Sequence, residues 1–230
     1  MSRITLLQSE TIRRGVRFTG RFCAEDGSPV DVSYTFEQAP DAAQNYASDA
    51  FLLTFLLPAM RVGEPLHIEA EVDAELLEHL DQVQRYWHTW CPQIFRRITI
   101  TADGLRATEG VLSPQAISCF SGGVDSCYTA LKHSGLFAST GDKRLPLTRL
   151  LMVHGMDIPL EDTAVFDRAY DRSVVLARAL GAGVSRAATD VRHLGRLYEI
   201  DWGVHLHGFA LAACLMFHQG AFGYGIIINP

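Results

Sequence analysis

The chain has 230 residues, a formal net charge of −6, and 48% hydrophobic and 20% charged residues. This composition fits one or two globular domains and excludes disordered, collagen-like and low-complexity proteins. Its apolar stretches fall short of the roughly 18–20 residues that a bilayer helix needs, so no membrane span is expected. Basic residues are scattered and outnumbered by acidic ones, which makes nucleic acid an unexpected partner.

The cysteine pattern favours a reducing compartment. The chain has five cysteines, an odd number, and no pair has CxxC spacing. The first residues, MSRITLLQSE, show no basic segment followed by an apolar one, so no secretory signal is predicted. These features predict a cytoplasmic protein with reduced thiols and no zinc ribbon.

The region before residue 112 alternates irregularly between strand and helix patterns. In chain order, the predicted elements are strands over 15–24 and 29–36, a helix over 48–57 that ends at Pro58, a strand over 66–72, a helix over 74–90, and a strand over 94–101 followed by a turn at Asp103-Gly104. Gly27 lies in the turn that joins the first two strands into a hairpin. We therefore predict a small α+β domain of unknown role over residues 1–111.

From residue 113 the pattern becomes strand, loop and helix, repeated. Strands are predicted over 116–120, 150–153, 184–188 and 225–228, and helices over 124–133, 163–180 and 204–217. This alternation predicts a doubly wound parallel sheet over residues 112–230, with ligands bound beyond the carboxyl ends of its strands. Because the chain stops directly after the fourth strand, this domain is expected to be C-terminally truncated.

The turn after the first of these strands, residues 121–126, reads SGGVDS. Its glycines permit positive φ and close approach of a ligand to the backbone. The helix that follows directs its free N–H groups and positive dipole end into the turn, which favours anions. A carboxylate, Asp125, within an anion site indicates a bridging Mg²⁺ ion. The alternative interpretation is a plain strand-to-helix turn with capping serines.

This hexapeptide resembles the SGGxDS signature of the PP-loop, or N-type ATP pyrophosphatase, superfamily. Residues 153–159, VHGMDIP, are similar to a segment of its asparagine-synthase-like members, and deazaguanine nitrile synthases form another similar group. The resemblance covers roughly residues 113–229. It implies an adenine nucleotide alpha-hydrolase-like fold and an enzyme that cleaves ATP to AMP and pyrophosphate, thereby activating an oxygen atom of its substrate.

The resemblance also implies roles for individual residues. Those implied to bind ATP are Cys119, Phe120, Ser121, Gly122, Gly123, Val124, Asp125, Ser126, His154, Gly155, Met156 and Asp157. Asp125, Ser126 and Arg192 are the implied catalytic residues, and Asp125 is the implied Mg²⁺ ligand. The alternatives are a structural role for His154, turn initiation for Asp157 and a surface ion pair for Arg192.

Cys127 and His205 lie near these segments. Cys127 is either a core or wall residue or a sulfur-transferring thiol. His205 is a candidate residue of the substrate pocket. His207 follows it by two positions, and this spacing makes the two side chains diverge on a helix rather than share a metal ion.

The leading functional interpretation is an AMP-forming ligase that activates a carboxylate or amide oxygen for C–N bond formation. Its substrate would be a small molecule or peptide, its nucleophile ammonia or an amine, and its candidate assembly a homodimer. Two alternatives stay open: a sulfur-inserting or tRNA-modifying enzyme of the same superfamily, and an adenine-nucleotide-binding module without turnover.

Overall fold

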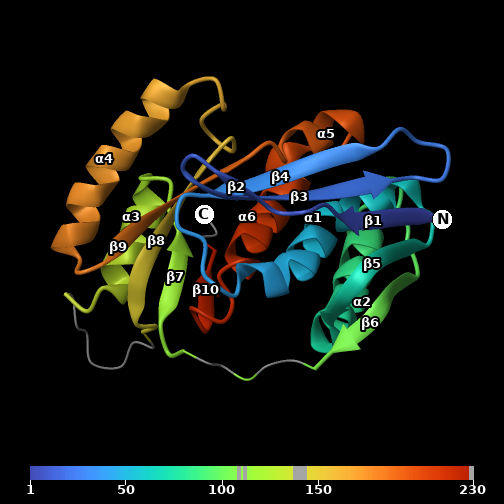
Figure 1. Ribbon diagram of the computed structural model, residues 1–230, viewed down its shortest axis with the longest axis horizontal. Helices are drawn as coiled ribbons and strands as arrows, with labels where there is room; N and C mark the ends of the chain where they lie inside the picture. Colours follow the sequence, from blue (N-terminus) through green and yellow to red (C-terminus); the bar gives the residue numbers. More distant parts are fainter. Residues whose placement is uncertain (108–109, 111–112, 137–143, 228–230) are drawn as a thin grey trace.

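The computed structural model describes residues 1–107, 110, 113–136 and 144–227 (Figure 1). Its strands, in chain order, are β1 (Ser2–Leu6), β2 (Glu10–Ile12), β3 (Gly15–Cys23), β4 (Val30–Phe36), β5 (Leu66–Asp73), β6 (Ile100–Arg106), β7 (Ala116–Cys119), β8 (Leu147–His154), β9 (Gly183–Thr189) and β10 (Tyr224–Ile226). Its helices are α1 (Ala47–Val62), α2 (Ala74–Trp90), α3 (Val124–His133), α4 (Thr163–Ala179), α5 (His193–Leu197) and α6 (His207–Met216). A 3₁₀ turn (Ala43–Tyr46) precedes α1, and a π-helical turn (Trp202–Leu206) precedes α6.

All the described strands belong to one ten-stranded mixed sheet. Its order is β10-β7-β8-β9-β4-β3-β1-β5-β6, with β2 paired to β3. The strands β10, β7, β8 and β9 are mutually parallel. The molecule is therefore an α/β protein, as the alternating pattern predicted. The predicted fourth strand reached residue 228, which lies outside the described residues.

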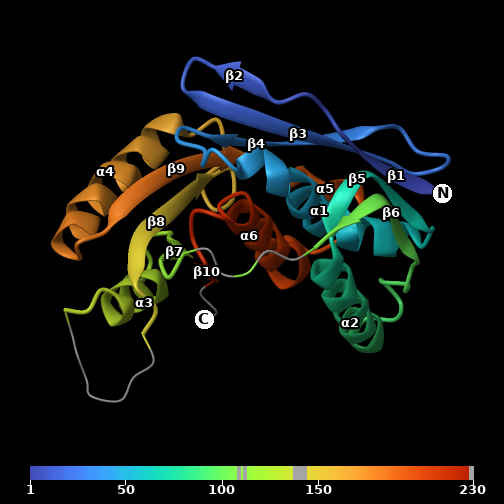
Figure 2. The same ribbon diagram turned by 60° about the horizontal axis from the view of Figure 1, so that its bottom comes forward.

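Helices cover both faces of the parallel strands, and side chains alternate between the two sides. Ile117 and Cys119 of β7 belong to the apolar core that includes α1 and α6. Ala116 and Phe120 instead pack into a second core with residues of α3 and α4. Figures 1 and 2 show α3 and α4 on one side of these strands and α6 on the other.

The strands of the N-terminal region continue this sheet. β4 pairs antiparallel with β9, with Tyr34 opposite Thr189. The Ser33 amide also donates to the Asp190 carboxylate at 2.8 Å. The core around α1 and α6 draws residues from both halves of the chain. Regions 1–111 and 112–230 thus share one sheet and one core, and residues 111–112, at the predicted boundary, lie outside the described residues.

The helix predicted to end at Pro58 continues to Val62, so this boundary was wrong. Pro58 lies inside α1, where its ring removes one backbone hydrogen bond. Nearly every residue of α1 is buried, and this packing outweighs the local cost of about 3 kcal/mol for an interior proline. The helix instead ends at Gly63, whose φ of 81° forms a left-handed cap.

The strand predicted over residues 94–101 was also largely wrong. The amides of Ile94 and Phe95 turn back to the carbonyl of Cys91, and Phe95 is buried. The strand in this region is β6, Ile100–Arg106, which contains the Asp103-Gly104 pair that was predicted as a turn. Tertiary pairing with β5, which includes a register shift near Glu71, overrides the local turn signal.

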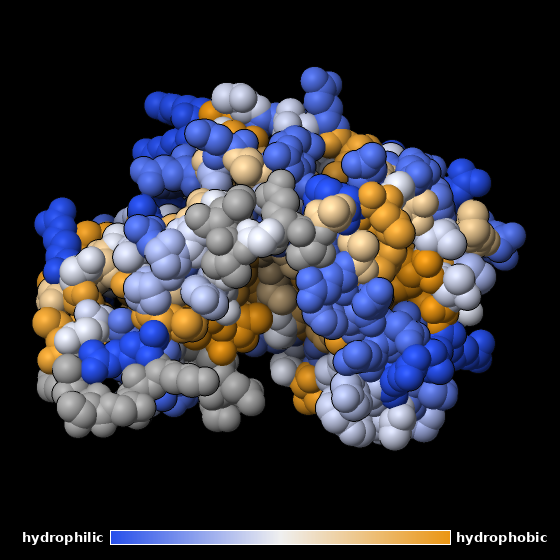
Figure 3. Space-filling model, turned by 90° about the horizontal axis from the view of Figure 1, so that it is seen from below, coloured by the Kyte–Doolittle hydropathy of each residue, from blue (hydrophilic) through white to orange (hydrophobic). Residues whose placement is uncertain are grey.

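No helix among the described residues has the length and apolarity required to cross a bilayer. On the face seen in Figure 3, apolar residues form several separate areas among polar ones.

A buried ion pair joins α1 to the β5–β6 edge of the sheet. Asp49 is fully buried and accepts a hydrogen bond from the Asp73 amide at 2.9 Å. Its other oxygen pairs with Arg106, whose guanidinium also lies over the Tyr46 ring. Burial raises the pKa of the Asp49 carboxyl above its usual range, against the opposing effect of these partners. The ionised form of Asp49 is therefore stabilised in the folded protein by its pairing with Arg106.

We expect Arg106→Leu to lower the free energy of unfolding by about 3 kcal/mol at neutral pH, because it leaves a buried carboxylate uncompensated. Since the folded-state pKa of Asp49 is raised, protonation of Asp49 favours the folded state as the pH falls toward the unfolded value of about 4. The loss in free energy of unfolding caused by Arg106→Leu should therefore be smaller at acidic pH than at neutral pH. Urea denaturation at several pH values measures this loss.

Arg61→Leu is the matched control, because Arg61 pairs with the largely exposed Glu199 and should contribute less than about 1 kcal/mol. A pH-independent deficit in Arg106→Leu would contradict this account of Asp49.

Candidate functional site

The glycine turn, Ser121–Gly123, follows the carboxyl end of β7, which is an interior strand of the sheet. The Phe120 amide donates to the Leu151 carbonyl at 2.9 Å and keeps β7 aligned with β8 up to the turn. Gly122 then takes a φ of 80°, which a residue with a side chain rarely adopts. Gly123 is extended and caps α3. The chain thus turns from strand to helix within the residues Ser121–Gly123.

Serine side chains fix the shape of this turn. The Ser126 hydroxyl donates to the Gly123 carbonyl at 2.9 Å, and the Gly123 amide donates weakly to Ser121 Oγ at 3.3 Å. The two serine hydroxyls are 3.4 Å apart. These contacts hold the backbone in place from both ends of the turn.

The first amides of α3 remain available to a ligand. Within the described part of the chain, the amides of Val124, Asp125 and Ser126 have no hydrogen-bond acceptor, and Gly123 supplies no side-chain cap. Such amides carry the positive end of the helix dipole. The turn is therefore preorganised to accept an anion.

A pocket of about 230 Å³ opens beside the turn. It is lined by Cys119, Phe120, Ser121, Gly123, Asp125, Ser126, Leu151, Met152, Val153, Met156, Asp157, Ile158, Phe166, His207 and Leu211. The pocket combines a polar end formed by the turn with an apolar wall formed by β8, the loop after it and α4. Eight of the lining positions are among the residues that the sequence implied.

The remaining implied residues lie outside this lining. Val124 points outward and is 84% exposed, and Gly122 shapes the turn. His154 is buried: its Nε2 lies 2.7 Å from the Pro159 carbonyl, and its ring stacks on Phe166 at 4.4 Å. These contacts fit the structural alternative for His154, and its role in binding ATP stays a prediction.

Gly155 closes the loop between β8 and α4. Its φ is 96°, and its amide donates to the Ile158 carbonyl at 3.0 Å. A β-carbon at this position would lie 1.9 Å from the carbonyl oxygen of Thr189. The glycine is therefore required by the close approach of β9, and it allows Met156 and Asp157 to turn into the pocket.

Arg192 lies behind the pocket rather than in it. Its Nη1 donates to the Met156 carbonyl at 2.7 Å, and its guanidinium lies 5.7 Å from the centre of the Trp202 ring. These contacts occupy the side chain and make Arg192 a support for the pocket wall.

The pocket carries acidic charge at its mouth. Asp125 and Asp157 are both exposed and line it, and no lysine or arginine does so among the described residues. No cluster of three potential metal-ligating side chains occurs in the described ranges. A Mg²⁺ ion would fit here only with phosphate or water oxygens completing its shell beside Asp125, which is the usual manner of Mg²⁺ binding.

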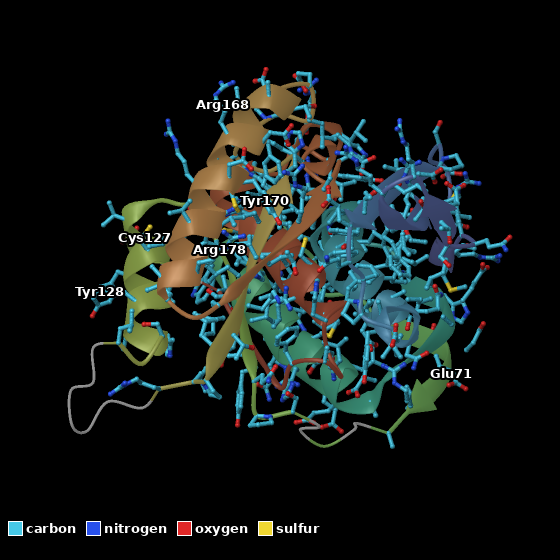
Figure 4. The ribbon with its side chains drawn as sticks, turned by 60° about the vertical axis from the view of Figure 1, so that its left-hand side comes forward. Glu71, Cys127, Tyr128, Arg168, Tyr170 and Arg178 are labelled. Atoms are coloured by element: carbon cyan, nitrogen blue, oxygen red, sulfur yellow. The ribbon has the colours of Figure 1, made fainter. Side chains whose placement is uncertain are left out.

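The cysteines near the site differ in accessibility. Burial raises the pKa of the Cys119 thiol to about 12, so this thiol stays protonated at neutral pH. Cys127 is half-buried, and its Sγ lies 3.6 Å from the Gly122 carbonyl. Figure 4 shows it on α3 beside Tyr128, which projects outward.

The structure separates the two histidines that precede α6. His205 is buried between Trp87 and Phe95, with its Nε2 3.9 Å from Cys91 Sγ, and it does not line the pocket. His207 does line it. Sequence reasoning did not select His207, because the docking of α6 against β7 decides which histidine faces the pocket. The β8 residues that line the pocket could have been predicted from their position at the carboxyl end of a strand.

Comparison of the chain with models of protein families, with curated proteins and with solved structures finds no match to any of them.

We expect Gly155→Ala to lower the free energy of unfolding by about 3 kcal/mol or more, because the new methyl group meets the Thr189 carbonyl and the positive φ adds strain. Gly135→Ala is the matched control. Its φ is 82°, but no described atom lies within 4 Å of the added carbon, so a loss of about 1 kcal/mol is expected. Urea denaturation measures both, and equal losses would show that the contact with Thr189 is unimportant.

Proposed function

We propose that the protein is an ATP-dependent adenylylating enzyme that cleaves ATP between its α- and β-phosphates and activates a carboxylate or amide oxygen for C–N bond formation. The observation that carries this proposal is the set of unpaired amides at Val124, Asp125 and Ser126, the last two of which belong to residues that line a pocket with an apolar wall. We further propose that the β7–β10 part of the fold is of the adenine nucleotide alpha-hydrolase-like type.

The two ends of the pocket suit the two ends of ATP. The glycine turn supplies backbone amide donors for phosphate oxygens. Met156, Ile158 and Leu151 supply an apolar wall for the base. Phe166 offers the base little of its ring surface, because one face stacks on His154 and Arg186 lies 5.4 Å from the ring centre.

Asp125 is the residue that would hold Mg²⁺. Its carboxylate lies on the first turn of α3, and no described ion pair occupies it. Bound Mg²⁺ neutralises phosphate charge and bridges phosphate oxygens to the protein. Without such an ion, a carboxylate beside a phosphate chain is repulsive, so Asp125 makes nucleotide binding dependent on the cation.

In the proposed reaction, the substrate oxygen forms a bond to the α-phosphorus and pyrophosphate leaves with the electrons of the broken P–O bond. Ammonia or an amine then attacks the activated carbon, and AMP leaves. The protein's own contribution is mainly positioning and charge stabilisation, since the hydrogen bonds that shape the turn form without a ligand. The substrates would be cytoplasmic small molecules or peptides that carry a carboxylate or amide.

A sulfur-inserting enzyme is less well supported. Cys119 is protonated by its burial, and Cys127 does not line the pocket. A module that binds adenine nucleotide without turnover shares the same turn, so turnover itself is the measurement that separates it from the ligase.

Pyrophosphate release from ATP and Mg²⁺, assayed with a panel of carboxylic acids and amines, tests the proposal. We expect Asp125→Asn to lower the rate by about a hundredfold, since loss of one charge-stabilising group costs about 3 kcal/mol in the transition state. Asp26→Asn is the matched control. This residue lies in the β3–β4 turn, at the end of the molecule near the N-terminus (Figure 1), and its substitution should leave the rate unchanged.

Full turnover in Asp125→Asn would remove the proposed role of the carboxylate. Tight binding of ATP by the wild-type protein without pyrophosphate release from any member of the panel would favour the non-catalytic module.

A further inference from the structure

The pocket contains two carboxylates and a single side chain able to carry positive charge. Asp125 and Asp157 line it together with His207, and the described lining residues include no lysine or arginine. A triphosphate would add several negative charges to this space. Because like charges at short range are costly away from bulk water, any donor among the side chains has a large effect on binding.

Helix α6 packs against β7, and His207 at its start lines the same pocket as the glycine turn. At one end of this contact, Ile117 and Leu215 line a second cavity of about 300 Å³. Further along, Cys119 Sγ lies 4.0 Å from the Leu211 carbonyl oxygen. Four residues of a helix span about 6 Å along its axis, and two residues of a strand span about 6.6 Å. Contacts four residues apart on α6 therefore match contacts two residues apart on β7. His207 lies one helical turn before Leu211, at the start of α6, and lines the same pocket as Ser121.

The His207 ring packs near another aromatic ring, and its nitrogens remain available to a ligand. The ring lies 5.5 Å from that of Trp202, which in turn lies under the guanidinium of Arg192. The backbone amide of His207 donates to the Trp202 carbonyl, so only its side chain is available to a ligand. Within the described part of the chain, the ring nitrogens make no hydrogen bond.

We propose that His207 is the side chain that binds the phosphate chain of the nucleotide, opposite the amides of α3. This inference rests on the proposed function, because it takes ATP as the ligand. The imidazole donates an N–H to a phosphate oxygen. His207 lines the same pocket as Ser121, one helical turn beyond the contact of Leu211 with Cys119, and this place assigns it to the phosphate end of the pocket rather than the base end. Trp202 and Arg192 act as positioning residues that hold the ring in this place.

Calorimetric titration with MgATP and with adenosine tests the assignment. His207→Leu keeps apolar bulk against Trp202 but removes the donor, and we expect the affinity for MgATP to fall about tenfold, the usual effect of losing one charge-assisted hydrogen bond. Adenosine affinity should change less than about twofold, because adenosine lacks the phosphates. His207→Gln restores an N–H donor and should recover part of the loss.

His79→Leu is the matched control, since His79 is an exposed histidine on α2 and its substitution should alter neither affinity. Equal losses for MgATP and adenosine in His207→Leu would indicate a distorted pocket and overturn the assignment, as would an unchanged affinity for MgATP.

The outcomes for the inference and for the proposed function are distinguishable. MgATP binding that is weakened by Asp125→Asn but not by His207→Leu overturns only the role of His207. A wild-type protein that does not bind MgATP overturns the proposed function and this inference together.

Discussion

The structure around the site depends on one constraint: the chain must turn from a buried strand into a helix without using the first amides of that helix. Gly122 meets this constraint with a positive φ, and Ser126 ties its hydroxyl to the Gly123 carbonyl instead of capping an amide. Serine at such a position usually satisfies a helix-start amide. Here the serines stabilise the turn while leaving donors unpaired, a state that is costly unless water or a ligand completes it.

The rest of the fold anchors the strand that leads into this turn and leaves the turn exposed. β7 lies between β10 and β8 in the sheet, so its carboxyl end is fixed on both sides. The antiparallel pairing of β4 with β9 extends the sheet and joins the N-terminal region to the same core. Arg192 then links the loop after β8 to Trp202 ahead of α6. Arg192 thus holds both the wall formed by the loop after β8 and the wall formed by the start of α6, although these segments are distant in sequence.

The sequence predicted well what depends on local chemistry. The glycine turn, the hairpin of β3 and β4, and the limits of α2 follow from glycine positions and apolar periodicity, and the structure contains all of them. It failed where packing overrides local preference, as at Pro58 within α1 and Asp103-Gly104 within β6. It also could not place Arg192 or select His207, because their surroundings are set by contacts between segments far apart in the chain.

The charge of the pocket has a consequence for how any polyanion is bound there. Side-chain cations would attract many anions, whereas this pocket presents carboxylates, backbone amides and one imidazole. Amides at a helix start act over a short range and only on a group that fits between them. The carboxylates repel an anion that arrives without a metal ion. Under the proposed function, these features would favour an anion that brings its own divalent cation and has an apolar portion to fill the wall beside Met156. Magnesium-bound ATP is such a ligand, whereas inorganic phosphate has no apolar portion.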